Sequence, residues 1–427
     1  MPMYQKCGEV PPKRHTQFRR PDGTLYTEEV LGLEGFSGNE SILYHHRSPC
    51  RVKKIHNHVA FKLEEWCPDQ YAHRHLRLHE FPEGGDAVRG RQPIMYNGDV
   101  VMSYVRPTDA MDYFYRNGQA DELIFIHEGK GTLRTTFGRI DYRPGDYLVI
   151  PRGTTYQFEF SDEVGSPVGG VLQGEAGAAA GSGNGKTRSE APQRHLVFET
   201  PSHFEIPKEF RNNYGMLHES APYYHRDIRT PAQLESFDER GEFEVIVKVA
   251  DGYSKYELDY HPFDVVGWDG YCYPWALNIE DYEPKAGRIH QPPPSHLTFR
   301  GRNFVICSFV PRMLDWDPLA IPIPYHHSNL DSEEVIYYVN GDFISRKGIE
   351  YASVTVHPSG LPHGPQPGAV EKSIGATRTD EWAVMIDTFK PLKLAKPAKD
   401  FDDDSYMYSW YTHEGAAEAP TQGMHTG

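Results

Sequence analysis

The chain has 427 residues, of which 38% are hydrophobic and 13% aromatic, so it is long and apolar enough to bury a sizeable core. Its formal net charge is −16, and no stretch concentrates Lys and Arg, which argues against a nucleic-acid partner. The apolar runs are too short for a membrane span, the first residues lack the apolar segment of a secretion signal, and five widely spaced cysteines without a CxxC pair favour a reducing cytoplasm over a disulfide framework.

The predicted elements are short strands. They begin after an Arg-, His- and Pro-rich stretch at 1–90, which we interpret as loops and short strands, and the first strand-like runs are 99–106, 122–127, 132–136 and 147–150. Residues 163–193 are rich in Gly, Ala and Ser, and we expect a mobile surface insert there. Further strand-like runs are 243–249, 303–310, 334–339, 352–356 and 382–389. Many short strands separated by turn residues predict a sandwich or barrel.

The sequence contains one internal repeat. Residues 121–129 (DELIFIHEG) resemble residues 333–341 (EEVIYYVNG), and in both a glutamate precedes a strand-like run and a glycine follows it after seven residues. A Pro-containing turn lies downstream of each copy, at 151–153 and at 361–364. Two related β-sandwich units in one chain predict an all-β bicupin, with two jelly-roll units, short helices and long loops.

The first copy lacks the residues of a cupin metal site, which takes histidines and a glutamate from one hairpin and a further histidine from a later turn. Arg116, Asn117 and Gln119 stand before Glu122 where histidines are needed, and Tyr156 stands where the later histidine is expected. Glu122 alone cannot hold a metal ion, so we interpret this copy as structural.

The second copy keeps all the parts, with His326 and His327 before its glutamate and His357 and His363 after it. Two histidines and a carboxylate on one face leave open coordination positions, which is the facial triad of oxygen-activating Fe(II) enzymes. The lack of thiolates argues against structural zinc. His357 either orients a ligand or contacts the substrate.

Adjacent residues leave a choice within this cluster. In an extended segment, neighbours point to opposite faces, so only one of His326 and His327, and one of Glu333 and Glu334, can face the metal. The spacing to Gly341 selects Glu334.

We therefore divide the chain into three parts. Residues 1–272 are expected to form a metal-free N-terminal cupin-like domain that carries the 163–193 insert. Residues 273–400 are expected to form the C-terminal cupin domain with the metal site, and 401–427 a flexible acidic and polar tail.

Several motifs carry a resemblance to a known family: GFSGNE at 35–40, YHPFDVVGWDG at 260–270 followed by Tyr-Pro, YHHSN at 325–329 and PHGP at 362–365. With them, most of the chain resembles the homogentisate 1,2-dioxygenase family. The resemblance implies that His327, Glu334 and His363 hold Fe(II). It also implies a histidine base for a phenolic hydroxyl, which falls on His290, with His296 as the alternative.

Two positions depart from the family pattern. Six residues separate His327 from Glu334, one more than in the family, so either the hairpin absorbs a residue or Glu333 is the ligand. A substrate-binding tyrosine of the family falls on Phe343, or on Asp342 with a shift of one residue, while the basic anchor falls on Arg346 or Lys347. The predicted substrate contacts are therefore His357, His363, Arg346 and Phe343.

The resemblance implies an Fe(II)-dependent, extradiol-type ring-cleaving dioxygenase that incorporates both atoms of O2. It would convert homogentisate to maleylacetoacetate in tyrosine and phenylalanine catabolism, as a cytoplasmic homo-oligomer, a trimer or hexamer. The expected partners are a small aromatic acid and O2, with no nucleic acid and no membrane. The alternatives are a related cupin dioxygenase for another hydroquinone or gentisate-like acid, a non-catalytic cupin that binds a small molecule, and a metal-dependent cupin isomerase.

Overall fold

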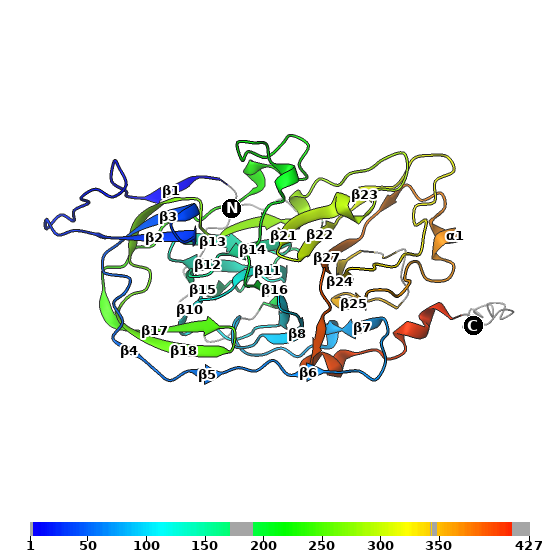
Figure 1. Ribbon diagram of the computed structural model, residues 1–427, viewed down its shortest axis with the longest axis horizontal. Coiled ribbons are helices and arrows are strands. Elements are labelled where there is room, and N and C mark those ends of the chain that lie inside the picture. Colours follow the sequence, from blue (N-terminus) through cyan, green and yellow to red (C-terminus); the bar gives the residue numbers. More distant parts are fainter. Residues whose placement is uncertain (1–2, 171–190, 342, 344–347, 412–427) are drawn as a thin grey trace, which may run out of the picture.

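The computed structural model describes residues 3–170, 191–341, 343 and 348–411. Residues 171–190 of the predicted insert and 412–427 of the predicted tail therefore lie outside the described residues. The sheets follow one another along the long axis of the molecule (Figure 1). The predicted all-β fold with two cupin-like units is confirmed.

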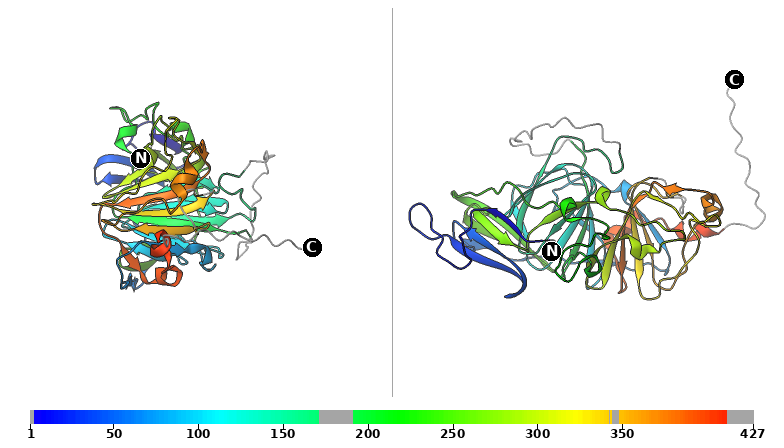
Figure 2. Two further views of the ribbon diagram at one scale, coloured as in Figure 1. Left: turned by 90° about the vertical axis from the view of Figure 1, so that its right-hand side faces the viewer. Right: turned by 90° about the horizontal axis from the view of Figure 1, so that it is seen from above.

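A four-stranded sheet, the wing sheet, joins the start of the chain to a segment near its middle. Seen from above in Figure 2, its blue strands lie at one end of the molecule. Its β19 carries the second half of the YHPFDVVGWDG motif, where Trp268 is fully buried and its Nε1 donates to the Phe137 carbonyl at 2.7 Å. The motif is therefore used in packing. The strands, in spatial order, are β1 (Gln5–Gly8), β19 (Val265–Gly270), β3 (Ser37–His45) and β2 (Thr27–Glu34).

Two eight-stranded sheets form the first unit. The outer sheet has the order β13 (Gly138–Tyr142), β12 (Gly131–Thr135), β15 (Thr155–Phe160), β10 (Phe114–Asn117), β17 (Arg240–Val249), β18 (Gly252–Tyr260) and β4 (Lys54–Ile55), and β5 (Val59–Ala60) also pairs with β18. The middle sheet has the order β20 (Trp275–Asn278), β14 (Asp146–Ile150), β11 (Asp121–Glu128), β16 (Arg194–Thr200), β9 (Val101–Val105), β8 (Gln92–Tyr96), β28 (Lys393–Ala395) and β6 (Glu65–Trp66). One buried apolar cluster contains Leu133 and Phe158 of the outer sheet and Ile124 and Leu148 of the middle sheet, so the two sheets share a core.

A six-stranded sheet, the C-terminal sheet, packs on the opposite face of the middle sheet. Its order is β21 (Leu297–Gly301), β22 (Phe304–Phe309), β27 (Trp382–Thr388), β24 (Glu333–Asn340), β25 (Ser353–His357) and β7 (Arg74–Arg77). Side chains alternate along β24, so Val335 and Tyr337 enter the core between the middle sheet and the C-terminal sheet, while Glu334 and Ile336 face the other way. This alternation places the predicted carboxylate ligand on the far face of the sheet.

The remaining elements are short. They are the strand pair β23 (Arg312–Met313) and β26 (Arg378–Thr379), the helix α1 (Ala369–Ser373), and the 3-10 turns η1 (Leu78–Glu80), η2 (Lys208–Phe210), η3 (His225–Asp227), η4 (Ile279–Asp281), η5 (Pro293–His296), η6 (Lys396–Phe401) and η7 (Tyr406–Trp410). None of the helices in the described part of the chain is long and apolar enough to cross a membrane. All five cysteines are free.

The two ends of the chain exchange strands between the units. β7 is an edge strand of the C-terminal sheet, while β28 pairs with β8 and β6 of the middle sheet. Residues 401–411, which the sequence analysis assigns to the flexible tail, continue into η7, where Tyr406 is buried. The reason is pairing between segments far apart in sequence, which residue composition does not encode.

The repeat predicted from the sequence corresponds to two equivalent sets of strands. β11 lies between β14 and β16 of the middle sheet, as β24 lies between β25 and β27 of the C-terminal sheet. Gly129 and Gly341, the repeat glycines, have φ angles of 107° and 98°, a conformation that favours glycine. The similarity of the two copies thus extends over three strands.

One ion cluster ties the wing sheet to the segment that precedes β19. The buried His45 lies between two carboxylates, with its Nδ1 2.7 Å from Asp264 Oδ1 and its Nε2 2.9 Å from Glu29 Oε2. Burial alone would lower the pKa of His45, but hydrogen bonds to Asp264 and Glu29 raise it from 6.5 to about 9. The folded protein therefore holds this side chain as an imidazolium.

This cluster predicts a loss of stability at alkaline pH. Because the pKa of His45 is raised on folding, its contribution is complete below pH 6.5, falls above it and is lost as the pH rises through about 9. Unfolding followed from pH 6 to pH 10 should show this decline in the unchanged protein and a flatter profile in His45→Gln. The neighbouring His46→Gln should retain the decline, and a flat profile in the unchanged protein would contradict the assignment.

Candidate metal centre

Three side chains converge on the far face of the C-terminal sheet. The ligand atoms of His327, Glu334 and His363 all lie within 4.8 Å of one another. His327 Nε2 is 3.6 Å from Glu334 Oε2, and His363 Nε2 is 3.5 Å from Glu334 Oε1. The structure thus brings together the three residues that the sequence analysis predicts as ligands, and their role as ligands stays a prediction.

Backbone hydrogen bonds hold the two histidines side by side. The N–H of His327 donates to the carbonyl of His363 at 2.8 Å, and the N–H of His363 donates back to His327 at the same distance. The two rings are 4.2 Å apart, centroid to centroid. Glu334, on β24, faces this bridge, so the triad depends on a strand and on two loops paired with each other.

The buried ring nitrogen of His363 fits a metal ligand. His363 Nδ1 donates to the Leu361 carbonyl at 3.2 Å, which leaves Nε2 as the lone-pair nitrogen that faces Glu334. This Nε2 is buried, since His363 is only 1% exposed, and it has no hydrogen-bond partner among the described residues. A buried acceptor without a donor is costly unless a ligand satisfies it. Two imidazoles and one carboxylate form a donor set suited to Fe(II) and similar divalent ions.

Of the two adjacent glutamates, Glu334 faces the histidines. Glu333 turns away, and its Oε2 accepts from the N–H of Leu392 at 2.6 Å. Burial would raise the pKa of Glu334, but the close imidazole rings of His327, His357 and His363 hold it well below its usual value. The carboxylate is therefore ionised, as a metal ligand must be.

His357 lies directly behind the carboxylate. It is opposite Glu334 in the β24–β25 register, and its Nδ1 is 2.8 Å from Glu334 Oε1. Its ring stacks on that of His363 at 4.4 Å, centroid to centroid. Its place is that of a side chain that orients the ligands, one of the two roles left open by the sequence.

Asp387 is a further acid at this centre, one that sequence analysis did not single out. It lies opposite Glu334 in the β24–β27 register, and its Oδ1 is buried without a hydrogen-bond partner among the described residues. Burial, together with the charge of Glu334, raises the pKa of Asp387 to about 8. Its equivalent in the first copy, Glu199, is opposite Glu122, so the repeat could have revealed it once three strands were aligned.

Gly364 allows the two ligand loops to approach. A Cβ atom at this position would lie 2.7 Å from the Cα atom of His326 and 2.9 Å from its ring. His326 itself points away from the triad, with its Nε2 3.0 Å from the Pro365 carbonyl. The close backbone approach thus requires a glycine directly after His363.

We therefore expect Gly364→Ala to weaken metal binding by at least about tenfold, since the added methyl group would push His327 away from His363. Titration of the metal-free protein with Co(II) measures this change. Gly98→Ala is a suitable control, because a Cβ at Gly98 meets no atom within 4 Å. Equal affinities in the two variants would contradict the geometric role of Gly364.

The two candidate bases occupy different surroundings. His290 is half-buried in a pocket, and one aromatic ring, that of Tyr325, lies between it and the triad: the centroids are 5.2 Å apart for His290 and Tyr325 and 5.9 Å for Tyr325 and His327. Burial, with a contribution from Arg312, lowers the pKa of His290, so its ring is neutral at neutral pH. The other residues that line this pocket are Lys285, Ala286, Gln291, Arg312, Met313, Leu314, Asp315 and Pro322.

His296 is instead part of the protein interior. It is 2% exposed and its ring lies 4.6 Å from that of Phe309, centroid to centroid. Burial, then the charge of Arg312, lowers its pKa to about 3. A base must be reachable by the substrate, and the half-buried His290 meets this requirement better than the buried His296. The sequence analysis did not single out Tyr325, although it directly precedes the His-His pair.

Of the predicted substrate contacts between β24 and β25, the structure describes only Phe343. Phe343 is 9% exposed and its ring lies 4.5 Å from that of Tyr338, in an edge-to-face contact that closes a small apolar cluster. It therefore packs on the same face of the sheet as Glu334 without offering a polar group. Arg346, with the alternatives Asp342 and Lys347, lies outside the described residues.

In the first copy, an arginine takes the place of a metal. Arg91 Nη1 lies 2.8 Å from Glu122 Oε1, and both side chains are almost fully buried. Tyr156, which stands where a histidine would be needed, donates to Glu122 at 2.5 Å, and Asn117 donates to it at 3.2 Å. In the first copy, the positions equivalent to the metal ligands therefore form a buried ion pair with added hydrogen bonds.

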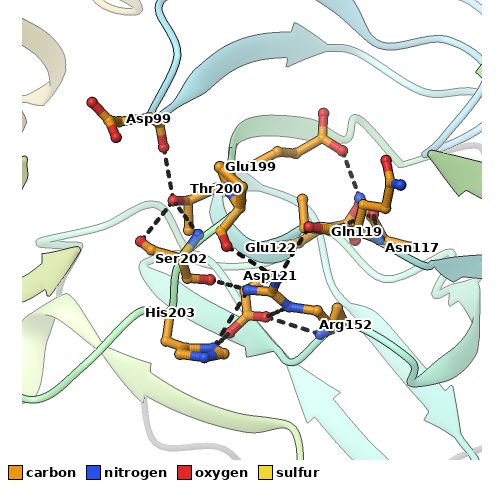
Figure 3. A network of polar contacts seen from close by, with 12 residues as sticks. Asp99, Asn117, Gln119, Asp121, Glu122, Arg152, Glu199, Thr200, Ser202 and His203 are labelled. Carbon is orange, nitrogen blue, oxygen red and sulfur yellow. Dashed lines mark hydrogen bonds and ion pairs between the residues drawn. The ribbon is translucent and has the colours of Figure 1, made fainter. Parts of the chain in front are cut away.

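This pair belongs to a wider buried polar network. Figure 3 shows Asn117 beside Glu199 and Glu122, next to the cluster in which Asp121 meets Arg152 and His203. Glu199 is also paired with Lys248, at 2.5 Å. The carboxylates of this copy therefore have cationic or amide partners from the protein itself.

Known proteins are similar in sequence to most of the chain. A family model described as the homogentisate 1,2-dioxygenase N-terminal domain matches residues 46–173. A protein described as a putative dioxygenase, from Saccharolobus solfataricus, is 40% identical over 415 residues, which is 96% of this chain and 100% of the relative. A homogentisate 1,2-dioxygenase from Bradyrhizobium diazoefficiens is 26% identical over 76% of this chain and 70% of its own length. A homogentisate 1,2-dioxygenase from Rhizobium leguminosarum is 25% identical over 90% of this chain and 86% of its own length.

Two matching solved structures have much lower identity and low TM-scores. A cupin 2 conserved barrel domain protein from Leptotrichia buccalis is 7% identical, with a TM-score of 0.30, over 75% of this chain and 99% of its own. A protein from Pseudomonas aeruginosa described as a putative glyoxylate induced protein is 11% identical, with a TM-score of 0.33. The match covers 80% of this chain and 97% of that protein.

Proposed function

Because the chain belongs to the homogentisate 1,2-dioxygenase family, we propose that it is an Fe(II)-dependent dioxygenase that opens the ring of a dihydroxylated aromatic acid, with homogentisate as the first candidate substrate. The observation that carries the proposal is the convergence of His327, Glu334 and His363, with a buried lone-pair nitrogen on His363. These three residues would hold the iron. Bound iron supplies electron transfer between an electron-rich ring and O2.

The residues around the triad have roles that follow from their places. His357 holds the carboxylate of Glu334 through a 2.8 Å hydrogen bond and so fixes the ligand that bears the negative charge. His290, neutral at neutral pH, would accept the proton of a phenolic hydroxyl placed between the pocket and the triad. Tyr325, whose ring lies between those of His290 and His327, would orient the aromatic ring of the substrate.

Phe343 favours a second candidate substrate. Its buried ring supplies no hydroxyl where the family has a substrate-binding tyrosine, so the enzyme would contact the substrate differently at this point. This favours a related cupin dioxygenase that acts on another hydroquinone or a gentisate-like acid. The reaction class is the same in both cases.

The test is oxygen uptake by the protein reconstituted anaerobically with Fe(II). With homogentisate, gentisate and other hydroquinone acids as substrates, we expect uptake with at least one of them, in a one-to-one ratio of O2 to ring opened. Uptake with gentisate but not homogentisate would reject the first candidate and support the second. No uptake above background with any of them, despite stoichiometric iron, would favour a non-catalytic cupin, and ring conversion without O2 an isomerase.

A further inference from the structure

The loop that carries His363, residues 361–366, is contacted by segments from distant parts of the chain. One is His73, just before β7, and the other is η7 near the C-terminus. In Figure 1 the ribbon of β7 and the red C-terminal turn both lie beside β25 and the loop region that follows it. Neither segment belongs to the repeat that supplies the triad.

His73 packs directly against the metal centre. The β7–β25 register pairs Arg74 with Val356, which puts His73 beside His357. Its ring lies 5.3 Å from that of His357 and 5.6 Å from that of His363, centroid to centroid, and the residue is 3% exposed. Its Nε2 is 3.1 Å from the carbonyl oxygen of Pro362, the residue before the ligand.

The C-terminal turn holds the other side of the same loop. The Nε1 of Trp410 donates to the carbonyls of Gly364 and Pro365, at 3.3 and 3.2 Å. The side chain of Gln366 donates to Ser409 Oγ at 2.6 Å. Hydrogen bonds therefore reach residues on both sides of His363.

The turn also reaches the side chain behind the carboxylate, because Tyr406 Oη lies 3.4 Å from His357 Nε2. It is itself fixed to β7: the N–H of Asp403 donates to the His75 carbonyl at 2.8 Å, and Arg74 pairs with Asp402 at 2.6 Å. The two segments thus form one unit, here called the loop clamp, which consists of His73, Tyr406, Ser409 and Trp410.

We propose that the loop clamp positions the metal ligand His363, with His73 and Trp410 as its positioning residues. The inference rests on the proposed metal centre. Ligands must be held to within about half an ångström of productive geometry, and groups behind them commonly change metal affinity by about 10- to 100-fold. A clamp drawn from outside the repeat lets the C-terminal turn control the affinity of a site formed by other residues.

The test compares ring-conserving variants. Trp410→Phe and His73→Phe keep an aromatic ring but lose the N–H donor to the loop, whereas His73→Gln restores a donor. Trp66→Phe and His79→Phe are matched controls, because Trp66 is also partly buried and His79 lies on the same segment as His73, paired with Glu80 and Glu350. The readouts are the dissociation constant for Co(II) by calorimetry, the visible absorption spectrum of the Co(II) form and the melting temperature without metal.

We expect Trp410→Phe and His73→Phe each to weaken Co(II) binding by about tenfold or more and to alter the spectrum, with the metal-free melting temperature unchanged. His73→Gln should recover most of the affinity, and the two controls should match the unchanged protein. Unaltered affinity and spectrum in the clamp variants would overturn the inference while leaving the proposed function intact. If the unchanged protein bound no Co(II), the proposed function would fail and the clamp with it.

If a clamp variant loses both Co(II) affinity and melting temperature, a milder substitution is needed to separate the two effects. Ser409→Ala removes only the hydroxyl that Gln366 contacts. Weaker Co(II) binding with an unchanged melting temperature in this variant supports the clamp, and unchanged binding overturns it.

Discussion

Glu334→Gln should weaken metal binding by a factor of at least about a thousand and abolish ring cleavage with it. The amide removes the only anionic ligand of the triad and weakens the hydrogen bond between this side chain and His357. The carboxylate is the centre of the site: His327, His357 and His363 all lie within 3.6 Å of it. The measurement is Fe(II) or Co(II) titration of the metal-free protein, followed by oxygen uptake at saturating metal.

The adjacent residue supplies the matched control. Glu333→Gln keeps an oxygen that can accept from Leu392 and changes no group that faces the histidines. It should bind metal like the unchanged protein. If Glu333→Gln lost metal while Glu334→Gln retained it, the ligand would be Glu333 and the strand register would differ from that described.

Arg91→Met should destabilise the protein by about 3–5 kcal/mol, because it leaves Glu122 buried in the first unit without its cation. Arg91 also donates to Tyr156 and to the carbonyl of Ala87, and both bonds would be lost. The measurement is denaturant unfolding of the metal-free protein, with metal affinity of the folded form as a second readout that should not change.

Two variants complete this experiment. Arg89→Met removes a half-exposed arginine two positions away, whose partners Asp112 and Glu244 are at the surface, and should cost less than about 1 kcal/mol. Arg91→Met combined with Glu122→Leu should recover much of the loss, since no unpaired charge stays buried. A small effect of Arg91→Met alone would contradict the view that the arginine substitutes for a metal in the first copy.

The sequence predicted the parts of this site that follow from local pattern. The repeat located β11 and β24, and its spacing to Gly341 selected Glu334, with Glu333 left as the alternative. Alternation along a strand showed that only one of His326 and His327 can face the metal, and the family resemblance selected His327. The same comparison recognised that Tyr156 occupies a ligand position in the first copy. These inferences work because residues close in sequence share one hairpin or one strand.

The rest of the site comes from pairing between distant segments, which local pattern does not report. β7 joins the C-terminal sheet next to β25 and brings His73 to the triad, and Trp410 arrives from a stretch whose composition predicted a flexible tail. Asp387 reads as an ordinary residue of a strand until the register places it opposite Glu334. Arg91 likewise lies between the stretch interpreted as loops and short strands and the first predicted strand at 99–106, more than one strand away from its partner Glu122.

The most direct test of the metal centre is anomalous diffraction at the iron absorption edge from crystals of the iron-loaded protein. We predict one strong peak per chain, within bonding distance of His327, Glu334 and His363, about 2.0–2.2 Å as for other divalent ions with imidazole and carboxylate ligands. No peak should appear between Arg91 and Glu122. A peak bound by other residues, or its absence from the triad in a crystal that contains iron, would contradict the account.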